Sequence, residues 1–78
     1  MTDYLSNAFA ELKTKSLRDI QMETARIWCA RACAAAQMGM LVDAVEYAHE
    51  SVEHAALSGD DVLLAHVRET LAAFQVPV

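Results

Sequence analysis

Helix-breaking residues are scarce in this chain, and their positions constrain the fold more than any other feature. The 78 residues include two glycines, Gly39 and Gly59, and one proline, Pro77. Between these positions apolar residues recur every three or four residues, which is the period of one helix face. No useful stretch alternates at a period of two, as a half-buried strand would. The chain is therefore predicted to be all-α, a small bundle of three to four helices.

Capping residues and glycines divide the chain into four predicted helices within a single domain, residues 1–78. Ser16-Leu17-Arg18-Asp19 approximates a capping box at the start of the second helix. Gly39 and Gly59 are placed to end the second and third helices in the left-handed conformation. Asp60 or Asp61 is placed to cap the fourth helix. The predicted helices cover about residues 3–13, 16–38, 41–57 and 61–75, and the tail over residues 75–78 is expected to fray.

The second predicted helix is apolar on most of its circumference. From Ala25 to Ala36 its only charged residues are Arg26 and Arg31. Such a helix is expected to be buried on more than one side, either centrally in the domain or against another chain. Trp28 is predicted to anchor the core. One stripe of this helix holds Leu17, Ile20, Thr24, Ile27, Trp28, Arg31, Ala35 and Met38, and a second holds Met22, Ala25, Cys29, Cys33 and Ala36.

The remaining predicted helices each carry a single apolar stripe. Small residues are concentrated from Ala30 to Ala36 and recur in the third helix, which predicts a closely packed hairpin of the second and third helices. The expected inward-facing residues are Tyr4, Leu5, Ala8, Phe9 and Leu12 in the first helix, Leu41, Ala44, Val45, Ala48, Val52 and Ala55 in the third, and Leu63, Leu64, Val67, Leu71 and Phe74 in the fourth.

The charge of the chain is strongly asymmetric. Eleven acidic and six basic residues give a net charge of −5. Residues 1–31 carry five bases and four acids, and residues 32–78 carry one base and seven acids. Such an acidic half argues against nucleic-acid binding and against anionic membrane surfaces. The chain has no apolar run long enough to span a membrane and no signal-like N-terminus, so a cytoplasmic protein is predicted.

The central part of the chain, about residues 25–58, resembles a tetratricopeptide repeat. Trp28 matches the aromatic residue that opens the family pattern, and Ala32 matches the small residue of close helix packing. Gly39 matches the glycine of the turn, and Ala44 matches the small residue of the second helix. The chain departs from the pattern at Arg31, Ala35 and Ala56. An unrelated small bundle that follows the same packing rules is the alternative interpretation.

The resemblance implies a peptide-binding concave surface on one face of the second helix. Arg26 on that surface would bind a carboxylate, because its guanidinium can pair with planar anions in a bidentate manner. The alternative is an ordinary surface arginine beside buried small residues. The residues that map to this surface are Arg26, Cys29, Cys33, Ala36 and Gln37.

Four acidic residues, Asp43, Glu46, Glu50 and Glu53, form a ridge at helical spacing on the third predicted helix. The ridge is suited to a basic segment of a partner protein, although a solvated helix face would look the same. His54 lies four residues after Glu50 and is expected to offset its charge.

Chemical motifs are sparse. Cys29 and Cys33 are four residues apart on one helix, too far for an easy disulfide, and the histidines fall on other helices. No zinc-site spacing, phosphate-binding glycine loop or nucleophile motif is present, so neither a metal, a cofactor nor catalysis is predicted.

The sequence therefore favours a small protein–protein interaction module that acts by helix packing. The partner would be another protein or a copy of the chain itself, as in a homodimer, because so short a chain buries little core of its own. Two alternatives remain: a secretion-type chaperone or anti-regulator that covers a partner's amphipathic helix, and a metal- or thiol-based sensor that uses Cys29, Cys33 and a histidine.

Overall fold

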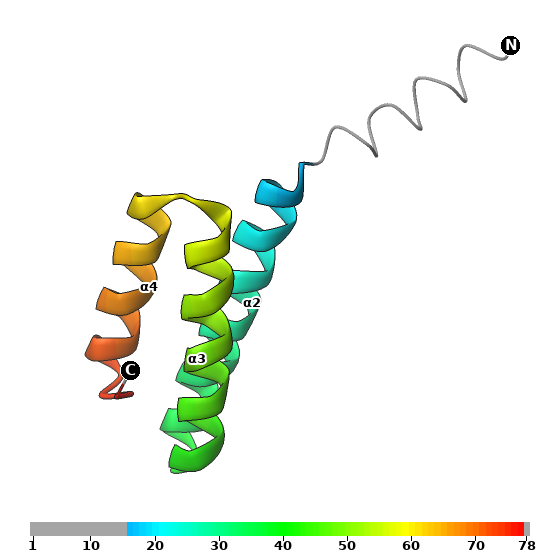
Figure 1. Ribbon diagram of the computed structural model, residues 1–78. Coiled ribbons are helices and arrows are strands. Elements are labelled where there is room, and N and C mark those ends of the chain that lie inside the picture. The colour runs from blue at the N-terminus through cyan, green and yellow to red at the C-terminus, as the bar shows by residue number, and fades with distance from the viewer. Residues whose placement is uncertain (1–15, 78) are drawn as a thin grey trace, which may run out of the picture.

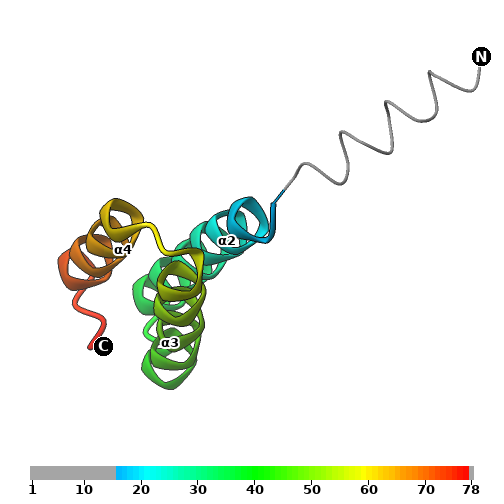
Figure 2. The same cartoon turned by 45° about the horizontal axis from the view of Figure 1, so that its top comes forward.

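The computed structural model describes residues 16–77, which form three helices joined by two tight turns (Figure 1). They are α2 (Leu17–Gln37), α3 (Leu41–Ser58) and α4 (Asp61–Ala73). α3 runs back along α2, and α4 packs beside both of them (Figure 2). The all-α fold and the α2–α3 hairpin are as predicted. α3 and α4 begin where predicted, and the other helix ends differ from the predicted ranges by one or two residues. The predicted helix over residues 3–13 lies outside the described residues.

The turn between α2 and α3 is a Schellman motif built around Gly39. The backbone N–H of Met40 donates to the Ala35 carbonyl, and the N–H of Gly39 donates to the Ala36 carbonyl. Gly39 adopts φ +75°, a left-handed conformation in which a side chain would be strained. The glycine thus ends α2 and turns the chain directly into α3.

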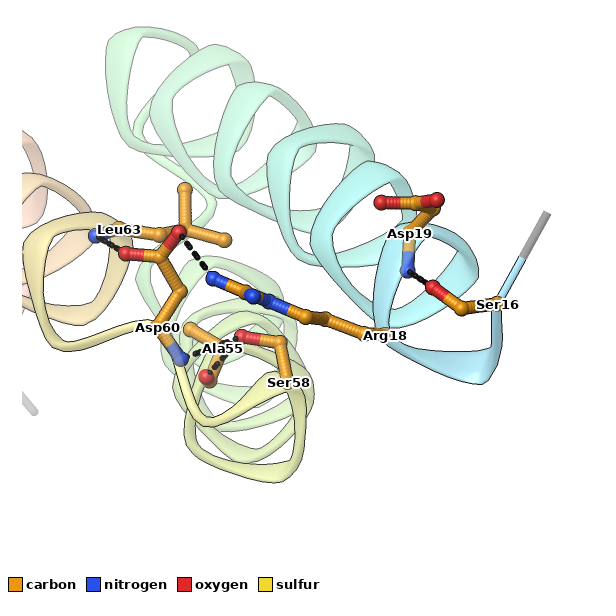
Figure 3. A network of polar contacts seen from close by, with 7 residues as sticks. All are labelled: Ser16, Arg18, Asp19, Ala55, Ser58, Asp60 and Leu63. Carbon is orange, nitrogen blue, oxygen red and sulfur yellow. Dashed lines mark hydrogen bonds and ion pairs between the residues drawn. The ribbon is translucent and has the colours of Figure 1, made fainter. Parts of the chain in front are cut away.

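The opposite end of the bundle is held by a network of polar contacts around the α3–α4 turn (Figure 3). The Asp60 carboxylate caps α4 by accepting from the Leu63 N–H at 2.9 Å, and the Ser58 hydroxyl accepts from the Asp60 N–H. Arg18, in the first turn of α2, reaches across to Asp60 at 3.4 Å. Ser16 caps α2 by accepting from the Asp19 N–H. Arg18 therefore ties the first turn of α2 to the start of α4.

Small side chains make the contact between α2 and α3. Most of the buried residues that α2 and α3 contribute are alanines, and a smaller side chain allows two helix axes to come closer. Ser51 of α3 lies at the same contact, and its hydroxyl donates to the Ala25 carbonyl of α2 at 2.7 Å. The buried residues of the hairpin are Ala25, Cys29, Ala32, Cys33 and Ala35 on α2 and Ala44, Ala48, Ser51, Ala55 and Ser58 on α3.

The larger core residues come from α4 and the chain that follows it. Leu63, Val67 and Leu71 are buried against the hairpin. After α4 the chain turns at Gln75, which adopts φ +59°, and the Val76 N–H donates to the Leu71 carbonyl. Val76 is itself buried, so the expectation that this tail frays is wrong for Gln75 and Val76. A long-range apolar contact holds Val76 against the core.

Three predicted core residues lie elsewhere. Leu41 is 57% exposed, because α2 has already ended where α3 begins and leaves no helix to cover it. Phe74, the residue that ends α4, is also exposed. Trp28 is only half-buried, so its predicted role as core anchor is wrong. A contact made of alanines leaves no room for an indole, and the ring lies at the edge of the hairpin instead.

The Ser51 hydrogen bond gives a first test of the hairpin. Ser51→Ala removes one buried interhelical hydrogen bond and is expected to lower the free energy of unfolding by about 1 kcal/mol. Thr24→Ala is the matched control, because the Thr24 hydroxyl donates to Ile20 within its own helix and at the surface. Urea denaturation measures both variants. Equal losses would contradict the structural role of Ser51.

The cap of α4 predicts a dependence of stability on pH. The Leu63 backbone N–H and the Arg18 guanidinium lower the pKa of Asp60 against an opposing effect of burial. The charged form of Asp60 therefore stabilises the folded state at pH values above the pKa that this carboxyl has in the unfolded chain. The stabilisation is lost progressively as the pH falls below about 5 and the carboxyl is protonated. Asp60→Asn keeps an amide cap but removes the charge, so its Tm should fall less between pH 7 and pH 3 than that of the wild type.

Thermal unfolding followed by circular dichroism at several pH values makes that comparison. Asp61→Asn removes an equal charge from a neighbour that does not cap the helix. A pH dependence reduced as much by Asp61→Asn as by Asp60→Asn would contradict the assignment to the cap.

Candidate functional site

The outer face of α2 carries large apolar residues that no described residue covers. Leu17 is 78% exposed and Met38 is 74% exposed, and Ile20 and Ile27 are each about half exposed. These four residues, here called the open face, belong to the first predicted stripe of this helix. The second stripe faces α3 and α4 instead. α2 is thus packed on two sides, as expected, and still exposes a band of apolar side chains.

Beside the open face, a surface hollow of about 560 Å³ lies at the edge of the α2–α3 hairpin. The Trp28 and Tyr47 rings pack together with their centroids 5.5 Å apart and their planes tilted by 36°. The Arg31 guanidinium lies 4.9 Å from the centroid of the Trp28 ring, within the range of a cation–π interaction. This Trp28 hollow is lined by Trp28, Glu46, Tyr47, His49 and Glu50.

A second, smaller hollow of about 220 Å³ lies between α2 and α4. It brings together three of the residues predicted to line a concave surface, Arg26, Cys29 and Cys33. His66 and Thr70 face them from α4, where their spacing of four residues places them on one side of the helix. The complete lining of this α2–α4 groove is Arg26, Cys29, Ala30, Cys33, His66, Val67 and Thr70.

The two cysteines in the groove are free, adjacent and buried. Burial raises the pKa of the Cys33 thiol, and the neighbouring Cys29 raises it further. A raised pKa keeps this thiol protonated near neutral pH, and a protonated thiol is a poor nucleophile. The pair therefore behaves as small apolar side chains that fill the contact between helices.

The other predicted binding residues are distributed over separate surfaces. Glu46 and Glu50 of the acidic ridge line the Trp28 hollow, whereas Asp43 and Glu53 do not. The Glu50 carboxylate lies 3.6 Å from Nε2 of His54, four residues later on the same helix. Gln37 ends α2 and is exposed outside both hollows.

Two features of these surfaces were missed from the sequence. His66 and Thr70 had no assigned place opposite the cysteines, because which side of α4 faces α2 depends on the turn between α3 and α4. Trp28 was assigned to the core, although Arg31, three residues later on the same apolar stripe, already indicated that this stripe reaches the surface.

Metal-binding and membrane-spanning features are absent from the described part of the chain. Over residues 16–77 no three His, Cys, Asp or Glu side chains converge to hold a metal ion. None of the helices within the same residues is long and apolar enough to cross a bilayer.

Comparison of the chain with protein-family models, with curated proteins and with solved structures finds no match. The open face, the Trp28 hollow and the α2–α4 groove are therefore the features that bear on function.

Burial of the two thiols predicts slow chemical modification. In the folded protein, iodoacetamide should alkylate Cys29 and Cys33 more slowly than in urea, because both residues are largely buried and Cys33 is kept protonated. Mass spectrometry of timed samples at pH 7.5 measures both rates. Equal rates in the folded and unfolded protein would contradict the buried positions of the thiols.

Proposed function

We propose that this protein is a small, non-enzymatic interaction module of the cytoplasm that binds another protein by helix packing. The open face of α2 carries the proposal. Leu17, Ile20 and Ile27 recur at helical spacing on one side of α2, and Met38 follows at its C-cap. Large apolar side chains grouped on one exposed side of a helix favour an interaction surface, because apolar residues that need no partner are usually scattered singly. A partner helix laid along α2 would bury this band in the manner of helix-in-groove recognition.

The composition of the core supports the same proposal. Among residues 16–77, half of the twelve buried apolar residues are alanines, and each alanine removes little apolar surface from water. The hairpin therefore gains less from its own core than a bundle packed with leucine or isoleucine would gain. Binding of a partner to the open face would add apolar burial and stabilise the folded state by mass action.

The tetratricopeptide-like interpretation of the hairpin is part of this proposal. Ala32 and Ala44, the two small residues that carry the resemblance, are both fully buried between the helices. Repeats of this kind stack on neighbouring helices through exposed apolar faces, and the open face of α2 is suited to such stacking.

A chaperone that covers an amphipathic helix of its partner is the second candidate, and the open face favours it equally. The two roles differ in stability. A chaperone of this kind should unfold at low temperature alone and show a large rise in Tm with its partner, whereas an adaptor should remain folded alone at the growth temperature and show a smaller rise.

Site-specific photocrosslinking tests the proposal. A photoreactive amino acid at position 27, on the open face, should form discrete crosslinked species in cells of the native host. The same group at position 69, an exposed position on α4, is the matched control. Ile27→Gln with the crosslinker at position 20 should weaken those species and change the free energy of unfolding by less than about 0.5 kcal/mol, because Ile27 is half exposed.

Sedimentation of the purified protein then shows whether the partner is a second copy. Crosslinking at positions 27 and 69 that is equal in pattern and yield would contradict an interface on the open face.

A further inference from the structure

The lining of the Trp28 hollow combines aromatic rings with negative charge. Trp28 and Tyr47 supply the rings, which pack against each other, and Glu46 and Glu50 supply two carboxylates. Glu46 and Glu50 are four residues apart on α3, so both carboxylates project from the same side of the helix. An aromatic surface beside negative charge suits a cation with an apolar stem.

The two carboxylates are available to a ligand. Glu46 is exposed, and the Glu50 side chain is 48% exposed. Within residues 16–77 neither of them pairs with an arginine or a lysine, and the contact made by Glu50 is with His54. Like charges at this spacing repel each other, so a cation placed between them would relieve an unfavourable interaction.

Arg31 shows that the Trp28 ring accepts a guanidinium. It lies over the ring at 4.9 Å, yet it does not line the hollow. The space beside Trp28 and Tyr47, on the side of Glu46 and Glu50, therefore remains open to a second cation.

We infer that the Trp28 hollow binds an arginine or lysine side chain from a basic segment of the partner protein. The aliphatic stem would pack on Trp28 and Tyr47, and the charged group would pair with Glu46 and Glu50. The inference rests on the proposed interaction function and specifies the chemistry of the partner. The neighbouring open face would take apolar residues of the same segment.

Charge favours a different protein over a second copy of this chain as the occupant. The chain has a net charge of −5, so two copies repel each other. Of its six basic residues, Arg18 is paired with Asp60 and Arg31 is stacked on Trp28. A basic segment of another protein would pair with Glu46 and Glu50 without bringing together two chains of net negative charge. It would also not need to break the contacts that Arg18 and Arg31 already make.

Intrinsic fluorescence gives a local measurement, because Trp28 is the single tryptophan of the chain. The probe is hexa-arginine with blocked ends, titrated into the full-length protein at low ionic strength. We expect saturable binding with a change in Trp28 emission. Hexacitrulline, which has nearly the same shape but no charge, should bind at least about tenfold more weakly, because the interaction with the two carboxylates is lost.

Two double variants with the same net charge distinguish binding in the Trp28 hollow from a general attraction of the basic peptide to an acidic protein. Glu46→Gln with Glu50→Gln should weaken hexa-arginine binding about tenfold, since it removes both carboxylates from the hollow. Asp43→Asn with Glu53→Gln removes the same charge from the same helix outside the hollow, and should change affinity less than about twofold. Circular dichroism verifies that both variants keep their helices.

Several results would overturn the inference. Equal weakening by the two double variants would show that only net charge matters. Equal binding of hexacitrulline would show that no cation is recognised, and unchanged Trp28 emission would place the peptide elsewhere. Emission that shifts with protein concentration alone would make a second copy the occupant. In each of these cases, crosslinking at position 27 still decides the proposed function by itself.

Discussion

The close approach of α2 and α3 is the constraint on which the rest of the structure depends. Two helices pack at the short end of the usual separation only where their facing side chains are small. Ala25, Ala32, Ala44 and Ala48 are fully buried at this contact. The Ser51 hydroxyl also lies there and donates to the Ala25 carbonyl across it, so that this buried polar side chain is satisfied. A larger side chain at any of these positions would force the helices apart.

This packing has a direct consequence for the surface. Because the contact accepts only small residues, the bulky apolar residues of α2 are excluded from it and lie outside. Ile20, Ile27 and Met38 face outward, and Trp28 lies over the edge of the hairpin against Tyr47. The same geometry that stabilises the hairpin thus creates the open face and the Trp28 hollow. The placement of small residues at the α2–α3 contact and of bulky apolar residues outside it thus accounts for the fold, and it also supplies the surfaces on which the proposed function depends.

The parts of the fold that depend on local chemistry were predictable from the sequence. A helix cap or a glycine turn involves only backbone groups a few residues away. The helices begin or end at the predicted places beside Ser16, Gly39, Gly59 and Asp60. The hairpin followed from the concentration of alanines. Two of these alanines, Ala32 and Ala44, are also the small residues named in the resemblance to a tetratricopeptide repeat.

The sequence did not determine which of the two apolar stripes of α2 is buried and which is left exposed. Two stripes of α2 are apolar, and periodicity alone ranks them equally. The structure buries the stripe of smaller residues. To predict this choice, one would have to compare the side-chain volumes of each stripe with the space between the helices. The return of Val76 to the core and the pairing of Arg18 with Asp60, 42 positions apart, depend on the turn between α3 and α4. The division of the acidic ridge, with only Glu46 and Glu50 at the hollow, depends on the rotation of α3 against α2.

Hydroxyl-radical footprinting of the full-length protein, read by mass spectrometry, tests the central claim most directly. The measurement is made at a dilution where sedimentation shows a monomer, and side-chain labelling is compared with that in urea. In the folded protein we expect Met38 to be labelled at nearly its unfolded rate and Ile20 and Ile27 at a large fraction of theirs, whereas Leu63 and Leu71 are strongly protected. Protection of Ile20 and Ile27 equal to that of Leu71 would show that the outer face of α2 is already covered, and would contradict the account.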